Sequence, residues 1–278
     1  MGFKVDIIEV NRETCRQDGV CAAVCPAGLI DFQKGGYPKP VPEAEEICIL
    51  CGHCVAACPT GSLTHRDMSA EKCVPLQDRL KLTPEQCEQF FKSRRSIRAF
   101  KKTPVKQKDI ERLIDIARYA PTGHNSECVE WLVLAERDEL QRLAGITIDW
   151  MRWMIKETPE LAKERHLDLV LKRWENGTDT ILRDAPVVIL ANAEKDIRLA
   201  ATGCLIALSH LELAAAGTGM GCCWAGFFFE AATTFTPMME ALSFPDGHDC
   251  YGAMMVGYPK YSYHRIPLRK DPRITWRL

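Results

Sequence analysis

The sequence predicts an α+β protein built from two domains of unequal size. Two cysteine-rich runs lie close together near the start of the chain, between Cys15 and Cys58. Beyond them the composition changes to long amphipathic segments with helical or strand periodicity. A chain of 278 residues is long enough for one large domain and one small one. We therefore expect a metal-binding domain at residues 1–68, a linker at 69–84 and a larger α+β domain at 85–278.

The second cysteine run has the spacing C-x2-C-x2-C-x3-C-P over residues 48–59. This spacing resembles that of bacterial ferredoxins, in which three thiolates hold one iron–sulfur cluster and the fourth reaches a partner cluster. The upstream run, residues 15–26, has the same frame with Asp18 at the second cysteine position. The pairing rule predicts a 4Fe-4S cluster at Cys25, Cys48, Cys51 and Cys54, and a 4Fe-4S or 3Fe-4S cluster at Cys15, Asp18, Cys21 and Cys58.

Zinc binding and disulfide formation fit these cysteines less well than clusters do. A structural zinc site generally uses two separated C-x2-C pairs, and a disulfide framework suits small secreted domains. The role of Asp18 has three alternatives: it binds an iron through oxygen, it leaves a three-iron cluster, or it faces solvent. Because the domain is small, we expect the metal to supply much of its stability.

The overall charge and hydropathy exclude several classes of partner. With 36 basic and 37 acidic residues the net charge is −1, which creates no general attraction for nucleic acid. The first ten residues mix charges with apolar side chains and are not typical of a signal peptide. No apolar run approaches the roughly 18 residues of a membrane helix. Since the fourteen cysteines come without a secretion signal, we expect a cytoplasmic protein with no membrane partner.

The larger domain alternates predicted helices and strands. Thr83 followed by Pro84 and Glu85 is a typical start of a helix. Further helices are expected at 109–119, 138–156, 161–174 and 196–216, and strands at 131–135, 186–190 and 251–256. The run PVVIL at 186–190 predicts a strand covered on both faces, and the long apolar helix that follows is expected to be central and to end at Gly217.

A basic segment opens this domain. Residues 92–108 contain eight Lys or Arg and no acid. Nucleic-acid binding would favour interleaved aromatic residues and a net basic chain, and a simple solvated face is a further alternative. The central sequence RRSIR, residues 94–98, supports a third interpretation. Forked guanidinium donors and a hydroxyl in an extended segment can surround a phosphate.

Four motifs in this domain resemble those of the nitroreductase family of FMN-dependent oxidoreductases. They are RRSIRAF at 94–100, APTGHNS at 120–126, the long helix leading into GTGMGCCWAG at 217–226, and GYP at 257–259 with RIP at 265–267. They occur in the family's order and span about residues 85–278. With the N-terminal runs, the whole chain resembles ferredoxin-fused nitroreductases. This resemblance implies an α+β sandwich with a central mixed sheet flanked by helices.

The resemblance also implies roles for individual residues. Arg94, Arg95, Ser96 and Arg98 would hold the FMN phosphate and ribityl chain, with Arg265 adding charge. The family builds its flavin site at a homodimer interface, so Pro121, Thr122, Gly123 and Asn125 would come from the second subunit. Backbone groups at Ala225 and Gly226 would face the flavin N5 atom, where glycine permits close approach.

The chain departs from the family pattern in two places. Glu127 stands where many members have glutamine, and an ionised carboxylate offers no donor to a flavin carbonyl. Tyr263 replaces a lysine near the last motif. His124 is either structural or serves in substrate contact or proton delivery. Cys222 and Cys223 are either packed apolar surface or a redox pair. The remaining cysteines lack ligand spacing and are expected to be structural: Cys73, Cys87, Cys128, Cys204 and Cys250.

The function that these observations predict is that of an FMN-dependent oxidoreductase with its own iron–sulfur relay. Electrons would come from NAD(P)H or a reduced ferredoxin-like protein, and small flat acceptors such as nitroaromatics or quinones would receive them. One alternative keeps the cofactors but performs reductive dehalogenation or flavin modification. A second alternative is a non-catalytic electron-transfer or redox-sensing protein.

Overall fold

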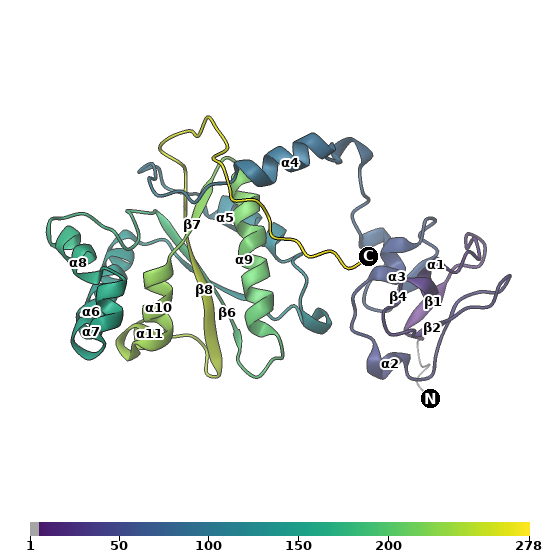
Figure 1. Ribbon diagram of the computed structural model, residues 1–278. Coiled ribbons are helices and arrows are strands. Elements are labelled where there is room, and N and C mark those ends of the chain that lie inside the picture. Colours follow the sequence, from purple (N-terminus) through teal and green to yellow (C-terminus); the bar gives the residue numbers. More distant parts are fainter. Residues whose placement is uncertain (1–5) are drawn as a thin grey trace. The chain divides into compact units, whose positions relative to one another are not determined.

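The computed structural model describes residues 6–278 and divides them into two compact units (Figure 1). The N-terminal unit runs to Lys81 and also includes the short segment His124–Ser126. The C-terminal unit contains Leu82–Gly123 and Glu127–Leu278. The α+β class is therefore confirmed, with helices and antiparallel strands in each unit.

In its described part, which begins at residue 6, the N-terminal unit contains two small two-stranded sheets and three short α-helices. Strand β1 (Ile8–Val10) pairs antiparallel with β4 (Leu63–His65), and β2 (Ile30–Asp31) pairs with β3 (Lys39–Pro40). The helices are α1 (Val20–Ala23), α2 (Ala44–Ile47) and α3 (His53–Ala57). Its core contains few large side chains, among them Ile7, Ile8, Val55 and Leu63. A core of this size provides little stability by itself, so bound metal is expected to contribute to the stability of the unit.

The residues that follow β4, up to Lys81, still belong to the N-terminal unit. Two 3-10 turns follow β4, η1 (Ala70–Lys72) and η2 (Asp78–Leu80). Met68, Ala70 and Cys73 pack against the N-terminal core. The first residues of the predicted linker therefore have tertiary contacts, whereas Val74 and Leu76 are exposed.

The C-terminal unit is built around one antiparallel sheet in the order β5-β6-β8-β7. Its strands are β5 (Glu130–Leu134), β6 (Val187–Glu194), β7 (Gly221–Trp224) and β8 (His248–Gly257). The resemblance implied a mixed sheet, but every strand pairing among residues 6–278 is antiparallel. Strands β6 and β7 run in the same direction, because each is antiparallel to β8. Since β8 lies between them, they do not pair directly.

The two central strands bury both of their faces. In β6, Val188 and Leu190 belong to one apolar cluster, whereas Val187 and Ile189 belong to a second one. This alternation follows from the two-residue period of a strand. The strand predicted at 186–190 is thus confirmed as covered on both sides, while β5 at the sheet edge is only partly buried.

Helices cover the sheet on each face (Figure 1). One face carries α5 (Gln107–Ala117) and α9 (Ala200–Gly217), and the opposite face carries α6 (Arg137–Glu157), α8 (Leu167–Glu175), α10 (Gly226–Thr234) and α11 (Thr236–Leu242). The unit also contains the helices α4 (Pro84–Ser93) and α7 (Pro159–Glu164) and the turn η3 (Gly123–Asn125). Thr83 caps α4 as expected, because its side chain accepts the Gln86 N–H while the Gln86 side chain accepts the Thr83 N–H.

Two helices differ from their predicted extents. The single helix expected at 161–174 is wrong, because the chain turns at His166, whose φ of 53° is left-handed, and so separates α7 from α8. The central helix begins at Ala200 rather than near Asp196, since Leu199 is also left-handed. Side-chain periodicity continues through such turns and does not reveal them.

The central helix α9 corrects the expectation that no apolar segment approaches the length of a membrane helix. Among residues 6–278 it is long and apolar enough to cross a membrane, with a mean hydropathy of 1.3. Its buried side chains, including Leu208 and Leu211, pack with Val187, Ile189 and Met254 of the sheet. The apolar composition is therefore that of a core helix.

Candidate functional site

The cysteines of the N-terminal unit form two groups, and each group draws on both runs. Burial raises the pKa of the Cys21 thiol, and the neighbouring Cys58 and Cys15 raise it further. Burial likewise raises the pKa of Cys54 to about 11, with Cys51 and Cys25 adding to the effect. The fourth cysteine of each run thus lies with the opposite run, as the ferredoxin pairing rule predicts.

The two runs share one local backbone geometry. Gly19 and Gly52 follow Asp18 and Cys51, and both adopt a left-handed φ, of 73° and 70°, before a short helix. A Cβ at Gly19 would lie 2.5 Å from the Phe32 ring. Glycine is therefore required at this turn for both conformation and space. Asp18 occupies the structural position that Cys51 has in the second run.

Asp18 borders the first cysteine group. It lines a small hollow, partly open to solvent, together with Cys15, Cys21 and Cys58. Its Oδ1 accepts the backbone N–H of Val20 at 3.1 Å, which orients the carboxylate at the start of α1. This placement brings Asp18 together with the three predicted cysteine ligands, whereas a role as iron ligand stays a prediction.

Backbone N–H groups stabilise the thiolate form of Cys25 and Cys58, the last cysteine of each run. The Leu29 N–H donates to Cys25 Sγ at 3.3 Å, and the Ser62 N–H donates to Cys58 Sγ at 3.2 Å. Burial alone would raise the pKa of Cys58, but hydrogen bonds from the backbone and from the Thr60 side chain lower it overall. Such donors stabilise the charged sulfur that binds iron.

The spacing of these groups fits clusters better than a single ion. Within residues 6–278, no three His, Cys, Asp or Glu side chains are close enough to hold one metal ion. In an iron–sulfur cube each thiolate contacts its own iron, so the ligands stand farther apart than around zinc. Two groups of sulfurs, each with a crossing cysteine, are consistent with that arrangement.

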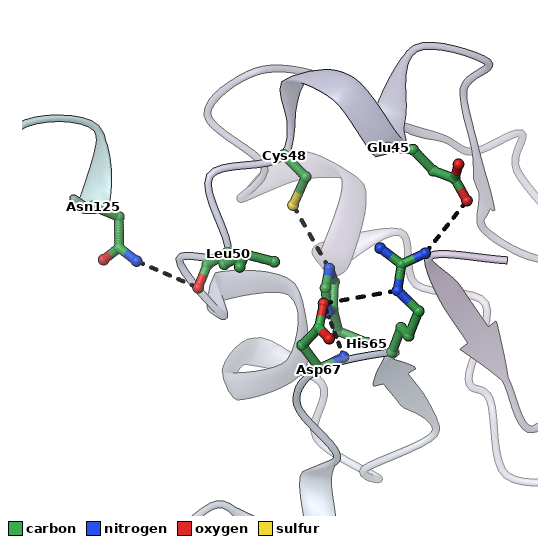
Figure 2. A network of polar contacts seen from close by, with 7 residues as sticks. Glu45, Cys48, Leu50, His65, Asp67 and Asn125 are labelled. Atoms are coloured by element: carbon green, nitrogen blue, oxygen red, sulfur yellow. Dashed lines mark hydrogen bonds and ion pairs between the residues drawn. The ribbon is translucent and has the colours of Figure 1, made fainter. Parts of the chain in front are cut away.

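Cys48 has a buried neighbour that its sequence position did not reveal. His65, at the end of β4, places Nε2 3.7 Å from Cys48 Sγ (Figure 2). Burial lowers the pKa of His65, although the nearby Asp67 opposes this effect. In the sequence, His65 stands just before the predicted linker, outside both cysteine runs, and no local pattern indicates a role for it.

In the C-terminal unit, three of the four motifs converge on one end of the sheet. The Ile97 N–H donates to the Cys222 carbonyl at 2.8 Å, and the Lys101 N–H donates to the Tyr258 carbonyl at 2.8 Å. The Lys260 N–H returns to the Ala99 carbonyl at 2.9 Å. The basic segment is therefore held in extended form beside β7 and the end of β8.

The arginines of this segment meet two residues that were not predicted as part of the site. Arg94 forms an ion pair with Glu212 of α9, with 2.7 Å between Nη1 and Oε1. Burial raises the pKa of the Cys223 thiol, whereas Arg98, Arg183 and Arg94 each act to lower it. The charges of these three arginines therefore act on Cys223 in β7, where Glu212 opposes them. Glu212, the single acid of an apolar helix, could have been noticed in the sequence, but Arg183 had no such signal.

Arg95, in the same segment, has a buried side-chain nitrogen that makes no hydrogen bond to residues 6–278. Its Nη2 donates to the Lys92 carbonyl, but its Nε is buried and has no hydrogen-bond partner within residues 6–278. A buried unpaired donor is costly unless a ligand or water completes it. Ser96 lies in the extended segment between Arg95 and Ile97 and is half-buried. The group fits a phosphate-bearing ligand.

The turn from β7 into α10 offers open backbone donors. The Ala225 N–H already donates to the Ala253 carbonyl at 2.9 Å, so it is used within the protein. Gly226 begins α10, and helix geometry leaves its N–H without an intrahelical partner. No atom lies within 4 Å of where a Gly226 Cβ would be. Of the two predicted contacts to flavin N5, this geometry favours Gly226.

The second motif lies away from the first within this chain. Thr122 lies against Gly203, near the start of α9, where a Cβ would approach its methyl group to 3.3 Å. Glu212, the partner of Arg94, follows nine residues later, about 14 Å along the helix axis. Pro121 and Gly123 flank Thr122. One chain therefore places the two halves of the predicted flavin site at different ends of α9.

The last part of the second motif groups with the N-terminal unit. His124 and Asn125 both have left-handed backbone, with φ of 53°. Asn125 Nδ2 donates to the Leu50 carbonyl at 3.4 Å (Figure 2). It also donates to the Ile49 carbonyl at 3.2 Å. Both carbonyls belong to the loop between Cys48 and Cys51. The predicted flavin ligand Asn125 thus contacts the cysteine loop.

Two more predicted features lie on the surface. Glu127 is exposed, and its backbone N–H donates to the Thr122 hydroxyl at 3.0 Å. Arg265 and Tyr263 belong to the C-terminal segment, residues 260–278, which has no helix or strand and is exposed throughout. The prediction that Arg265 adds charge beside the arginines of residues 94–98 therefore stays a prediction.

The family assignment rests on the larger unit. The model of the nitroreductase family matches residues 91–258, which is more than half of the chain. The chain belongs to the nitroreductase family. A 4Fe-4S dicluster domain model matches residues 14–62, which include both cysteine runs.

Known proteins similar to this nitroreductase are distant in sequence. A protein of Archaeoglobus fulgidus, named as a putative NADH dehydrogenase/NAD(P)H nitroreductase, is 21% identical over 63% of this chain and 87% of its own length. The structure of a Bacteroides fragilis nitroreductase with bound FMN superposes with a TM-score of 0.57 at 21% identity, covering 68% of this chain and 96% of that one.

Two further structures share the fold. A Desulfitobacterium hafniense nitroreductase with bound FMN has a TM-score of 0.54 at 18% identity, over 68% of this chain and 96% of that one. A BluB-like flavoprotein of Clostridium difficile has a TM-score of 0.53 at 19% identity, over 66% of this chain and 94% of that one. At these identities the likeness establishes the fold of the C-terminal unit.

Proposed function

We propose that this nitroreductase binds FMN and reduces small flat acceptors such as nitroaromatics or quinones. The observation that carries the proposal is the basic segment at residues 94–98, which is held beside β7 by the hydrogen bond from Ile97 to Cys222 and in which the buried Arg95 Nε has no partner among residues 6–278. Strand β7 leads directly into the open backbone at Gly226. A group of positive charges beside a glycine that leaves space suits a phosphate joined to a planar ring. Bound FMN would supply the hydride and electron transfer, and the protein would orient it.

Individual side chains have distinct tasks in this proposal. Arg94, Arg95, Ser96 and Arg98 bind the phosphate and ribityl chain, and the buried Arg95 Nε provides a donor still to be satisfied. Glu212 holds Arg94 in place through its ion pair. The Gly226 N–H is directed at flavin N5. Ala225 lies at the turn before Gly226 and lines the flavin site without donating to it, since its own N–H donates to the Ala253 carbonyl.

The complete site is proposed to form in a homodimer. Pro121, Thr122, Gly123 and Asn125 come from the second subunit, because within one chain this motif lies at the opposite end of α9 from Arg94. The exposed C-terminal segment supports dimerisation. It presents Tyr261, Ile266, Leu268, Ile274 and Trp276 to solvent in the single chain. Covering these apolar side chains would be favourable.

The N-terminal unit is proposed to serve as an electron relay. It holds one cluster at Cys25, Cys48, Cys51 and Cys54 and a second at Cys15, Cys21 and Cys58 with Asp18. Electrons come from NAD(P)H or from a reduced ferredoxin-like protein. The free thiols require a reducing compartment, so we place the protein in the cytoplasm.

The first test is the cofactor content of anaerobically purified protein. We expect one FMN per chain with about seven or eight irons and matching sulfide, together with steady-state reduction of a nitroaromatic or a quinone. Iron without flavin in a folded sample would instead favour an electron carrier. Flavin and clusters without any turnover of these acceptors would contradict the proposed reaction.

Removing charge from the phosphate site tests the residues. The double variant Arg94→Ala and Arg98→Ala should yield folded protein with little flavin, because phosphate is held largely by forked cations. Arg142→Ala is the matched control, since Arg142 forms a surface ion pair with Glu139. Full flavin retention in the double variant would show that the phosphate binds elsewhere.

A further inference from the structure

The loop that carries Cys48 is contacted by a buried imidazole. His65 is only 5% exposed, and its Nε2 lies 3.7 Å from Cys48 Sγ, within reach of a hydrogen bond to sulfur. The two residues are distant in sequence and meet because β4 ends beside the cysteine loop (Figure 2). Hydrogen bonds to cluster sulfurs are one of the means by which a protein tunes an iron–sulfur centre.

The orientation of this ring determines which nitrogen carries the proton. The backbone N–H of Asp67 donates to His65 Nδ1 at 3.0 Å, so Nδ1 is the acceptor. A neutral imidazole has one donor and one acceptor nitrogen. The proton therefore resides on Nε2, which faces Cys48 Sγ.

The backbone around His65 holds the ring in place. The His65 N–H donates to the Met68 carbonyl and the Met68 N–H donates to the His65 carbonyl, each at 2.9 Å. This closed turn rests against the cysteine loop, since a Cβ at Gly52 would lie 2.6 Å from Met68 Sδ. The imidazole and the loop are thus fixed relative to one another by packing as well as by the hydrogen bond.

The charged neighbours of the ring lie on its solvent side. The Asp67 carboxylate is 3.8 Å from His65 Nδ1 and also 3.8 Å from Arg66 Nε. Arg66 in turn contacts Glu45 at 3.4 Å (Figure 2). These side chains are partly or largely exposed, so their electrostatic effect is weakened by water. Within this group of side chains, the nearly buried His65 Nε2–H is the donor that faces a predicted ligand, Cys48.

We propose that His65 is a positioning residue that donates its Nε2–H to the Cys48 thiolate and raises the reduction potential of the cluster held there. The inference rests on the proposed ligation of that cluster by Cys25, Cys48, Cys51 and Cys54. Reduction adds negative charge to the cluster and its sulfurs, and a donor stabilises the more negative state. The reduced cluster is favoured as a result, which makes this centre a better electron acceptor within the relay.

A redox titration monitored by EPR tests this proposal on the full-length holoprotein. His65→Leu should lower the midpoint potential of the cluster at Cys48 and leave the second cluster unchanged. His65→Gln, which restores an N–H donor, should recover part of the shift. His53→Leu is the matched control, because His53 follows this loop as the first residue of α3, is exposed, and contacts the Cys51 carbonyl rather than a cysteine sulfur.

Iron and sulfide content separates a failure of this inference from a failure of the cluster assignment. If His65→Leu keeps its full iron content with an unchanged potential, or if His53→Leu shifts the potential equally, the proposal is overturned. If the wild-type protein contains no iron–sulfur cluster, the cluster assignment itself is wrong.

A second measurement does not depend on the leucine variant folding. Pulsed EPR of reduced protein labelled with ¹⁵N-histidine should detect a weak coupling between the cluster and an imidazole nitrogen. That coupling should persist in His53→Leu and disappear in His65→Gln. If the wild-type protein contains its clusters but shows no such nitrogen coupling, the proposed hydrogen bond from His65 to Cys48 is overturned.

Discussion

The same side chain has opposite roles in the two units of this nitroreductase. In the N-terminal unit, cysteines gather in two groups around short loops, where backbone N–H groups point at sulfur. In the C-terminal unit, Cys204, Cys222 and Cys250 are buried in the apolar core, and burial raises their pKa values, that of Cys204 to about 12. Placement rather than number decides whether thiols bind metal or act as apolar packing.

The two units also differ in what holds them together. The C-terminal unit buries an apolar cluster on each face of its sheet, with contributions from the helices that cover both faces. The N-terminal unit has one small cluster, and several of its partly buried members are cysteines proposed as ligands. A core of this size is marginal without added links, so metal and fold are expected to depend on each other there.

Removing iron should have the largest effect and should be confined to one unit. Anaerobic chelation is expected to unfold the N-terminal unit, since its core cannot replace the lost metal–sulfur bonds. Hydrogen exchange measured by mass spectrometry should show loss of protection in β1 and β4 but persistence in β6 and β8. Equal loss of protection in both sheets would break the contrast between the units.

A core truncation should weaken the C-terminal unit through packing alone. Leu167 and Leu169 lie on one helix, but Leu167 is 0% exposed and Leu169 is 45% exposed. Leu167→Ala should lower the free energy of unfolding of this unit by about 2–5 kcal/mol, because it leaves a cavity. Leu169→Ala, the control, should change it far less. Denaturant titration followed by circular dichroism compares the two, and equal effects would contradict the assigned core.

Changing Asp18 should alter one cluster without affecting the fold. Asp18→Cys is expected to convert a labile or three-iron centre into a stable four-iron one, since thiolate replaces a harder oxygen ligand. EPR in both redox states, with iron counting, measures the change. Asp31→Cys places an extra thiol at an exposed site in the same unit and should have no such effect. Spectra unaffected by Asp18→Cys would argue that Asp18 is not at a ligand position.

The smallest effect expected is on thiol labelling. At neutral pH the exposed Cys87 should react with iodoacetamide while Cys204 and Cys222 do not, because their raised pKa values leave almost no thiolate. Chelation should then expose the predicted cluster ligands and increase labelling only in the N-terminal unit. Peptide mapping by mass spectrometry reads out each site, and labelling of Cys204 in folded protein would contradict its assigned burial.

Much of the fold could be predicted because local patterns carry it. The capped helix at Thr83, the doubly buried strand predicted at 186–190 and the central apolar helix all follow from spacing of a few residues. The break at His166 was missed because a two-residue turn barely disturbs an apolar pattern. The mixed sheet implied by the resemblance differs from the antiparallel pairings found among residues 6–278, because strand pairing depends on where β8 inserts.

The sequence by itself indicated iron–sulfur chemistry, since the spacing within each cysteine run is local, whereas the fold brings the last cysteine of each run to the opposite group. It also determined the family and the two-sided sheet. Only the tertiary structure joined Arg94 to Glu212, brought Arg183 near Cys223 and placed His65 against Cys48. These contacts link residues far apart along the chain, and their geometry depends on how whole elements pack rather than on any local pattern.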